Sequence, residues 1–346
     1  MKNVYLIVTD LHLFYKNLRS RVDYQNETNV VWNKLLELVG KYEGANVNVL
    51  FLGDLFHRGY PDTFSAVVGN NLFHDLSKRV SGVYTVLGNH ELSYYKDNPF
   101  YTLIKDIGSE RVRNAGVKYC KPVGLTDVVR VVDEVVDGEV TFYFNHYGTG
   151  IAKPENKVNI GLFHQDIVSR AVVAQAEKIF GTTVYAKESD VEGLKLLEGY
   201  QYSFFGHMHQ MFGMYGLDDG SILYYLGSLG RTNVAEVNDE FLTRDIPAVV
   251  VEDGVLKKLE RNLFELPGRK QCVNEDTVAE NKGSYEDQKE VKEARAYSFN
   301  GDNPMEELLA RLGENVAAMQ IAKELAVNPI DSVGAQIFGE VGKYGH

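Results

Sequence analysis

The sequence predicts an α/β fold, and three observations carry the prediction. Short apolar runs rich in β-branched and aromatic residues recur from Val4 to Ser228, as expected of buried strands. Stretches with apolar residues at helical spacing separate the first of these runs. Most of the runs end in Asp, Asn or His, and ligand sites in such sheets lie beyond the carboxyl ends of the strands.

The predicted strands are short and bounded by turn signals, which separates them from the longer helical stretches. They are Val4–Asp10, Val47–Asp54, Gly82–His90, Val140–His146, Val158–His164, Tyr200–His209 and Ile222–Ser228. One strand that ends in Asp or His is unremarkable, but a series of them predicts a shared site at one edge of the sheet.

Helices are predicted between the strands. In Asn29–Tyr42 the apolar residues form a single stripe at helical spacing. Thr63–Leu76 is predicted to be a second helix and Asn98–Ile107 a third, with Pro99 in its first turn. The stretch Ala171–Glu198 is predicted to be helical at first and then rich in turns.

The C-terminal part is predicted to hold smaller elements. Asp245–Phe264 predicts one or two strands around the turn Glu252–Gly254. Gln271–Lys292 is polar and predicts a linker or a solvated part of a small cap. Met305–Val327 predicts an amphipathic helix, which packs on its own chain or docks onto a partner.

Charge and composition bound the class of protein. The net charge of −12 argues against tight nucleic-acid binding by the chain alone, unless bound cations or a basic partner offset it. The two cysteines, Cys120 and Cys272, are too few for a disulfide scaffold, so a reducing compartment is expected. The sequence contains no apolar run that is long enough to predict a membrane span. The short apolar run at the N-terminus predicts a strand and not a signal peptide.

Five short motifs place metal-binding side chains at the predicted strand ends. They are Asp10-Leu-His12, Gly53-Asp54-Leu-Phe-His57, Gly88-Asn89-His90-Glu91, Phe163-His164-Gln165 and Gly206-His207-Met-His209. A lone Asp-x-His or a lone buried His is more often structural, so the prediction rests on the set.

The mixture of side chains in these motifs predicts a pair of divalent cations. Two cations about 3.5–4 Å apart bind the attacking and the leaving oxygen of a phosphoester together. A carboxylate has to bridge the cations and offset their repulsion, and Asp54 is the predicted bridge. Imidazole ligands favour transition metals, so Mn²⁺ is predicted first, with Fe²⁺, Zn²⁺ or Mg²⁺ as alternatives.

The motif series resembles the calcineurin-like metallophosphoesterase superfamily. The segment Gly53–His57, followed by Pro61, resembles the second motif of the SbcD-type nucleases, the exonuclease subunits of double-strand-break repair. The segment Tyr225–Asn233 resembles the Gly-Ser-Leu-x-Arg-Thr segment of the same subfamily. The resemblance extends from about Asn3 to Asn233 and is carried by the motifs.

The resemblance implies a four-layer core of two packed mixed β-sheets flanked by helices, and a role for each motif residue. His90 would protonate or stabilise the leaving oxygen, and His57 would position DNA or phosphate. The implied ligands are Asp10, His12, Asp54 and His209 for the first cation, and Asp54, Asn89, His164 and His207 for the second.

The resemblance also implies a domain plan and partners. Residues 1–245 would form the catalytic domain, 246–300 a small capping or DNA-contact region, and 301–346 a helical tail. Such a protein would be a DNA exo/endonuclease subunit that acts in end processing, recombination and repair. It would form a homodimer, join an SMC-like coiled-coil ATPase, and act in the cytoplasm of a bacterium or a phage-infected host.

Several alternatives stay open. His146 also ends a predicted strand and competes with His164, although the His-Gln pair favours His164. Protein serine/threonine phosphatases share two motifs but carry Asp at the position of His57 and Gly at that of Leu13. Cyclic-nucleotide phosphodiesterases keep Gly-His-x-His without needing the Gly-Ser-Leu-x-Arg-Thr segment. A non-catalytic scaffold would have lost a ligand, and none is missing.

Overall fold

The structure is a computed structural model of the chain. It describes residues 1–13, 24–57, 63–92, 101–103, 109–115, 120–122, 128–180, 193–231 and 236–275. The chain divides into two compact units, Met1–Val273 and Asn274–His346. The predicted helix Met305–Val327 and most of the polar stretch Gln271–Lys292 lie outside the described residues.

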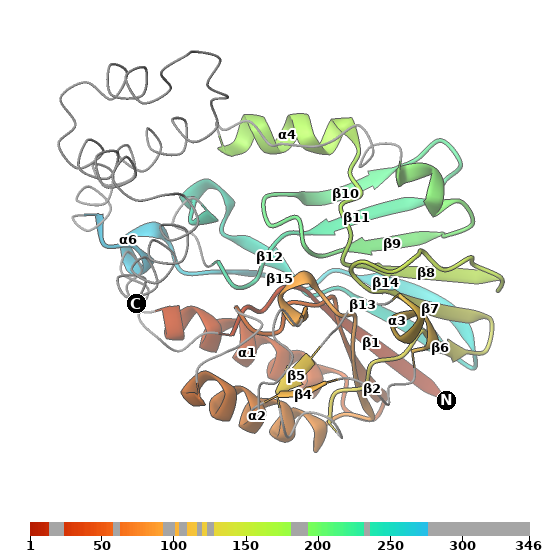
Figure 1. The fold of residues 1–346 in the computed structure, drawn as a ribbon, viewed down its shortest axis with the longest axis horizontal. Coiled ribbons are helices and arrows are strands. Elements are labelled where there is room, and N and C mark those ends of the chain that lie inside the picture. The colour runs from red at the N-terminus through yellow and green to blue at the C-terminus, as the bar shows by residue number, and fades with distance from the viewer. Residues whose placement is uncertain are drawn as a thin grey trace, which may run out of the picture. The chain divides into compact units, whose positions relative to one another are not determined.

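The first sheet of the Met1–Val273 unit has the strand order β14-β13-β1-β2-β3 (Figure 1). Strands β1, β2 and β3 are parallel, whereas β13 is antiparallel to β1 and β14 to β13. The strands are β1 (Lys2–Val8), β2 (Asn46–Phe51), β3 (Gly82–Thr85), β13 (Ala248–Glu252) and β14 (Val255–Glu260).

The second sheet has the order β10-β11-β9-β8-β7-β6. Its four central strands are parallel and both outer strands are antiparallel to their neighbours. The strands are β6 (Glu134–Asp137), β7 (Val140–Asn145), β8 (Val158–Phe163), β9 (Tyr202–Phe205), β10 (Phe212–Gly216) and β11 (Ile222–Leu226).

Alternation along β1 explains how the layers pack. Successive side chains of a strand point to opposite faces. Leu6 therefore packs in one core with helices α1 (Tyr24–Lys41) and α2 (Thr63–Ser77), through Trp32 and Phe73. The next residue on the strand, Ile7, packs in a second core against the second sheet.

The outer face of the second sheet is covered by helix α4 (Arg170–Phe180). Phe163, Phe205 and Tyr225 stack across three neighbouring strands, with ring centroids 5.0 and 4.7 Å apart. Val172 of α4 belongs to the same buried core as these rings. The unit thus has four layers, helices outside two packed mixed sheets, which confirms the predicted fold class (Figure 1).

The prediction of a helix at Asn98–Ile107 is wrong for Tyr101–Leu103, the part of this stretch that the structure describes. Tyr101–Leu103 forms strand β4, which pairs antiparallel with β5 (Cys120–Pro122). Tyr101 and Thr102 are aromatic and β-branched, and such residues favour strands. Pro99 suits the first turn of a helix but does not require one, so it was weak evidence.

The predicted division after residue 245 falls inside the first sheet. Strand β13 begins at Ala248 and pairs with β1 from Ala248↔Leu6 to Glu252↔Lys2. The turn to β14 has positive φ at Asp253 and Gly254, 50° and 74°, as a tight two-residue hairpin requires. Strands β13 and β14, just beyond residue 245, therefore belong to the first sheet.

The remaining described elements are short connections. They are η1 (Asn89–Glu91), α3 (Glu110–Asn114), η2 (Gly193–Leu197), η4 (Asp239–Phe241), β12 (Thr243–Asp245), β15 (Leu263–Glu265) and α6 (Arg269–Cys272). Across the described part of the chain, no helix is both long enough and apolar enough to cross a membrane.

Candidate metal centre

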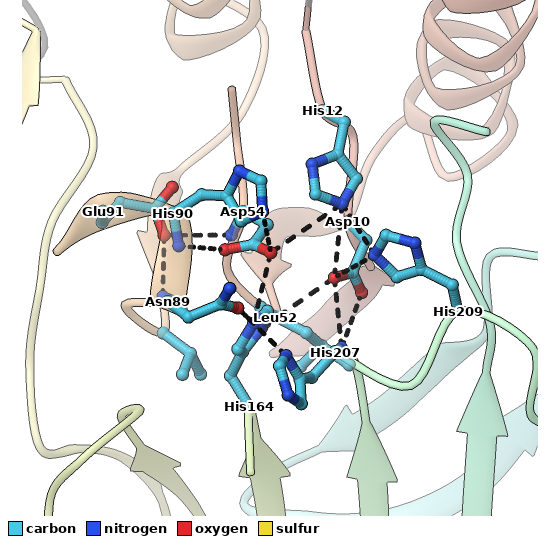
Figure 2. Close-up of polar contacts among 12 residues, drawn as sticks. Asp10, His12, Leu52, Asp54, Asn89, His90, Glu91, His164, His207 and His209 are labelled. Carbon is cyan, nitrogen blue, oxygen red and sulfur yellow. Dashed lines mark hydrogen bonds and ion pairs between the residues drawn. The ribbon is translucent and has the colours of Figure 1, made fainter. Parts of the chain in front are cut away.

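The predicted ligands lie on loops just beyond the carboxyl ends of parallel strands. All seven predicted strands are present, as β1, β2, β3, β7, β8, β9 and β11, and each ends before the polar residue predicted to end it. Figure 2 shows the side chains of these loops turned toward one another from both sheets. The sheets thus bring together residues that are about 200 positions apart, such as Asp10 and His209.

One group of side chains joins the two sheets. The ligand atoms of Asp10, His12, Asp54 and His209 all lie within 4.8 Å of one another. Nε2 of His12 is 2.8 Å from Nε2 of His209, so both nitrogens point at one small volume. The same His12 nitrogen is 3.9 Å from an Asp10 oxygen and 3.8 Å from an Asp54 oxygen.

A second group shares Asp54 with the first. Ligand atoms of Asp54, His164 and His207 lie within 4.8 Å of one another. Nε2 of His164 is 3.4 Å from Oδ2 of Asp54. Oδ1 of Asn89 is 2.9 Å from that nitrogen and 3.0 Å from Nδ1 of His207. Asp54 is thus the carboxylate common to both groups, as the sequence predicted for the bridge.

The two remaining predicted histidines lie beside these groups. His12, His57 and His90 also have ligand atoms within 4.8 Å of one another. The backbone N–H of His90 donates to Oδ1 of Asp54 at 2.9 Å, and Nε2 of its ring is 3.9 Å from Oδ2. The His90 ring is 30% exposed, so a substrate can reach it.

Backbone strain is concentrated at the ligands. Five non-glycine residues in the described part of the chain have positive φ, and four of them are predicted ligands. Each such residue costs on the order of 1 kcal/mol or more, and strain of this kind clusters at functional sites. The four are Asp10 at 32°, His12 at 44°, Asp54 at 49° and His207 at 70°.

Close packing holds the bridging carboxylate in place. A Cβ atom added to Gly88 would lie 2.1 Å from Oδ1 of Asp54 and 2.8 Å from Cε1 of His164. Only glycine allows the backbone to approach a carboxylate that closely.

The electrostatics of the site are those of a buried, mixed-charge cluster. Burial opposes ionisation of Asp54, but His164 and His12 outweigh burial and hold the pKa of Asp54 well below its usual range. Burial also works against protonation of His164, yet Asp54 and Asp10 raise its pKa to about 10. Burial raises the pKa of Asp10 and, together with His209, lowers the pKa of His12. Such a cluster, held out of water, gains stability when a cation enters it.

The donor set fits two divalent cations. The first group offers two carboxylates and two imidazoles, and the second a carboxylate, an amide oxygen and two imidazoles. Mixed nitrogen and oxygen ligands of this kind suit Mn²⁺, Fe²⁺ or Zn²⁺. The chain therefore contains a candidate dinuclear metal site.

Comparison with known proteins agrees with this geometry. The family model described as calcineurin-like phosphoesterase matches residues 4–211. The chain belongs to the calcineurin-like phosphoesterase family. No curated protein matches this phosphoesterase.

One solved structure that the chain matches is the 5'-nucleotidase precursor of Thermus thermophilus. It is 12% identical, with a TM-score of 0.37, over 82% of this phosphoesterase and 58% of that chain. The phosphoesterase thus spans less than two thirds of the length of that protein.

The ligand histidines of the phosphoesterase are oriented through their second ring nitrogen. Nδ1 of His164 donates to the backbone oxygen of Leu52 at 2.6 Å. Nε2 of His207 is 2.8 Å from Oδ1 of Asp166, and Nδ1 of His209 is 2.9 Å from Oε1 of Glu236.

The sequence analysis did not identify Asp166 and Glu236 as partners of the ligand histidines. Gln165 donates to the backbone oxygens of His146 and Thr149. Asp166 follows the His-Gln pair directly, which was a usable signal. Glu236 lies outside every motif, and no pattern in the sequence marks it.

Glu91 ties two ligand loops together. Its Oε2 accepts from the backbone N–H groups of Asp54 and Gly88 at 3.0 and 2.7 Å, and its Oε1 accepts from Leu55 at 2.8 Å. Burial, followed by the charge of Asp54, raises the pKa of Glu91 to about 7. Glu91 thus supports the loop that carries Asp54.

His146 lies apart from both groups of ligands. Its Nδ1 accepts from the backbone N–H of Leu87, and its Nε2 donates to the backbone oxygen of Val132, each at 3.0 Å. Burial and then the charge of Arg111 lower the pKa of His146 to about 3. A neutral histidine with both nitrogens engaged in the core fits a structural role, and His164 is the one that faces Asp54.

The Gly-Ser-Leu-Gly-Arg segment, Gly227–Arg231, contacts the backbone of Asp10. The backbone N–H of Gly230 and the hydroxyl of Ser228 both donate to the backbone oxygen of Asp10, at 2.9 and 3.3 Å. Arg231 is fully buried and donates to both carboxylate oxygens of Glu27 in α1, at 3.1 and 2.7 Å. The segment therefore anchors the strained Asp10 backbone to the helical layer.

Proposed function

We propose that this phosphoesterase is a metal-dependent DNA exo/endonuclease that hydrolyses phosphodiester bonds by a two-metal mechanism. The observation that carries the proposal is the pair His57 and His90 beside the Asp54-centred cluster. The ring centroid of His57 is 5.9 Å from that of His12 and from that of His90. Serine/threonine phosphatases carry Asp where His57 stands, so the extra imidazole favours the nuclease branch.

Each side chain has a defined task in this mechanism. The first cation is assigned to Asp10, His12 and His209 and the second to Asn89, His164 and His207, with Asp54 shared by both. When bound, the two cations stabilise the negative charge that develops on the phosphoryl oxygens.

His90 is the proposed proton donor to the leaving oxygen. The backbone oxygen of His57 accepts a hydrogen bond from Nδ1–H of His90, which leaves Nε2 directed at the cluster. The proton given to the leaving oxygen is therefore the Nε2 proton of the imidazolium form. General acids and electrostatic stabilisers typically contribute a factor of about 10²–10⁴. His57 is proposed to position the phosphate next to this ring.

Two further features support DNA as the substrate class. The second motif and the Gly-Ser-Leu-Gly-Arg-Thr segment resemble those of SbcD-type nucleases. The net charge of −12 also disfavours holding the phosphate backbone unaided, which favours a subunit that works with a DNA-binding partner. We propose an SMC-like coiled-coil ATPase as that partner, with the segment Met305–Val327 as the docking element and a homodimer of the nuclease within the complex.

The substrate class is tested by turnover with Mn²⁺. Linear duplex DNA, a phosphopeptide and a cyclic nucleotide are compared at equal concentration, and DNA is expected to be cleaved fastest. His57→Ala should lose DNA cleavage, whereas His74→Ala, an exposed histidine on α2, should not. Faster turnover of the phosphopeptide would transfer the assignment to the phosphatase class.

The partner proposal has its own test. Deletion of residues 305–346 should leave Mn²⁺ binding and cleavage of short single strands intact, and should abolish co-purification with the ATPase. Unchanged co-purification would refute the docking role of the tail.

A further inference from the structure

The two histidines of the Gly-His-x-His motif face the cluster with opposite ring nitrogens. His207 directs Nδ1 to Oδ1 of Asn89 at 3.0 Å, and its Nε2 is held by Asp166. His209 directs Nε2 to Nε2 of His12 at 2.8 Å, and its Nδ1 is held by Glu236. Each imidazole is therefore fixed between the cluster and a carboxylate that belongs to neither ligand group.

A carboxylate at hydrogen-bond distance selects the tautomer of a neutral imidazole. An ionised carboxylate can only accept, so the nitrogen that it contacts carries the proton. The other nitrogen then keeps its lone pair for a cation. Asp166 selects the Nε2–H tautomer of His207, and Glu236 selects the Nδ1–H tautomer of His209.

We propose that Asp166 and Glu236 are positioning residues, each of which fixes the tautomer of one histidine and sets the affinity of one divalent cation without affecting the other. The inference rests on the proposed two-cation site and assigns to each cation one residue that sets its affinity. Asp166 acts on the cation assigned to His164 and His207, and Glu236 on the cation assigned to His209.

The connectivity of the chain keeps the two effects separate. Asp166 lies two residues after His164, on the loop that follows β8, so it belongs to the side of the second group. Glu236 lies beyond β11 and contacts His209 on the side of the first group.

Burial sets the relative size of the two effects. The Glu236 side chain is 13% exposed and that of Asp166 is 49% exposed. Water screens the exposed pair more strongly, so its interaction is weaker. Outer carboxylates of this kind typically change metal affinity about 10–100-fold. We expect the lower end of that range for Asp166 and the upper end for Glu236.

The test is titration calorimetry of the full chain with Mn²⁺ in the absence of substrate. Wild type should bind two ions. Glu236→Gln keeps an acceptor but loses the charge, and Glu236→Ala loses both, so affinity for one ion should fall progressively along that series. Asp166→Asn and Asp166→Ala should do the same for the other ion. Glu139→Gln, which removes a carboxylate 42% exposed on the β6–β7 turn, should change neither.

Ligand variants identify which ion is affected. His209→Ala removes the first ion, and adding Glu236→Gln to it should cause no further loss of affinity for the second. His207→Ala combined with Asp166→Asn should behave in the mirror-image way. Equal weakening of both ions by either carboxylate variant would overturn the proposal, and so would unchanged affinity in both Ala variants.

A spectroscopic readout separates tautomer control from a loss of fold. Burial works against protonation of His209, but Glu236 raises its pKa to about 9, so the spectra have to be recorded above pH ~10, where the ring is neutral. Long-range ¹H–¹⁵N correlation spectra of metal-free protein with labelled histidine should then show His207 protonated on Nε2 and His209 on Nδ1. Asp166→Ala should give a mixture of tautomers at His207 alone, with an unchanged circular dichroism melt. A single unchanged tautomer would contradict the inference. Because no substrate is present in either experiment, failure of the nuclease assignment would leave both results interpretable.

Discussion

Substitution of Gly88 by alanine tests the packing around the bridging carboxylate. Gly88 has φ −89° and ψ −179°, which alanine adopts without strain. The only obstacle to the substitution is therefore steric overlap of the new Cβ with its neighbours. The new Cβ would lie 2.1 Å from Oδ1 of Asp54, and contacts under 3.0 Å essentially do not occur, so the carboxylate has to move by roughly 1 Å.

The consequences follow from what Asp54 touches. The same oxygen accepts from the backbone N–H of His90 at 2.9 Å, and that hydrogen bond would be lost or distorted. Overpacking of this kind destabilises a fold by about 1–3 kcal/mol. A misplacement of about 1 Å at a reacting centre lowers the rate by about 100-fold. We expect weaker binding of both Mn²⁺ ions and a loss of activity of that order.

Calorimetric Mn²⁺ titration and urea unfolding measure the two effects of Gly88→Ala. Gly40→Ala is the matched control, because Gly40 lies in α1 with no atom within 4 Å of an added Cβ. It should bind Mn²⁺ normally and gain about 0.4–1 kcal/mol of stability. Wild-type metal affinity and activity in Gly88→Ala would show that the packing argument is wrong.

Three further predictions concern single side chains. His90→Ala should keep both metal ions, by elemental analysis, and lose cleavage by about 100-fold or more; loss of metal would make His90 a ligand. Asp54→Asn should lose both ions, and full activity in this variant would remove Asp54 from the site. His146 has a pKa of about 3 in the folded state, below its unfolded value near 6.5, so its contribution to stability is present above pH 6.5 and is lost as the pH falls. Between pH 7 and 5, wild type should lose about 2 kcal/mol more unfolding free energy than His146→Asn, and equal losses would contradict a neutral buried ring.

Much of the site was predictable because it follows strand ends. An apolar run followed by a polar residue fixes both the strand and the edge of the sheet at which the side chain emerges. That pattern located Asp10, Asp54 and His164, but it also marked His146, and only the His-Gln pair favoured His164. Two sheets whose parallel strands point the same way then bring these ends together.

Other features depended on tertiary pairing and could not be read from local pattern. Strand β13 belongs to the first sheet because it pairs with β1, about 250 positions away. Glu236 orients His209 across a fold that no spacing rule encodes. The strained backbone at Asp10 depends on contacts from Ser228 and Gly230, which lie far along the chain.

The most direct test of the central claim is anomalous diffraction from crystals soaked in Mn²⁺. Two peaks are expected about 3.5–4 Å apart, one among Asp10, His12 and His209 and the other among Asn89, His164 and His207. Asp54 should contact both. A single peak, or peaks that do not touch Asp54, would contradict the two-cation account.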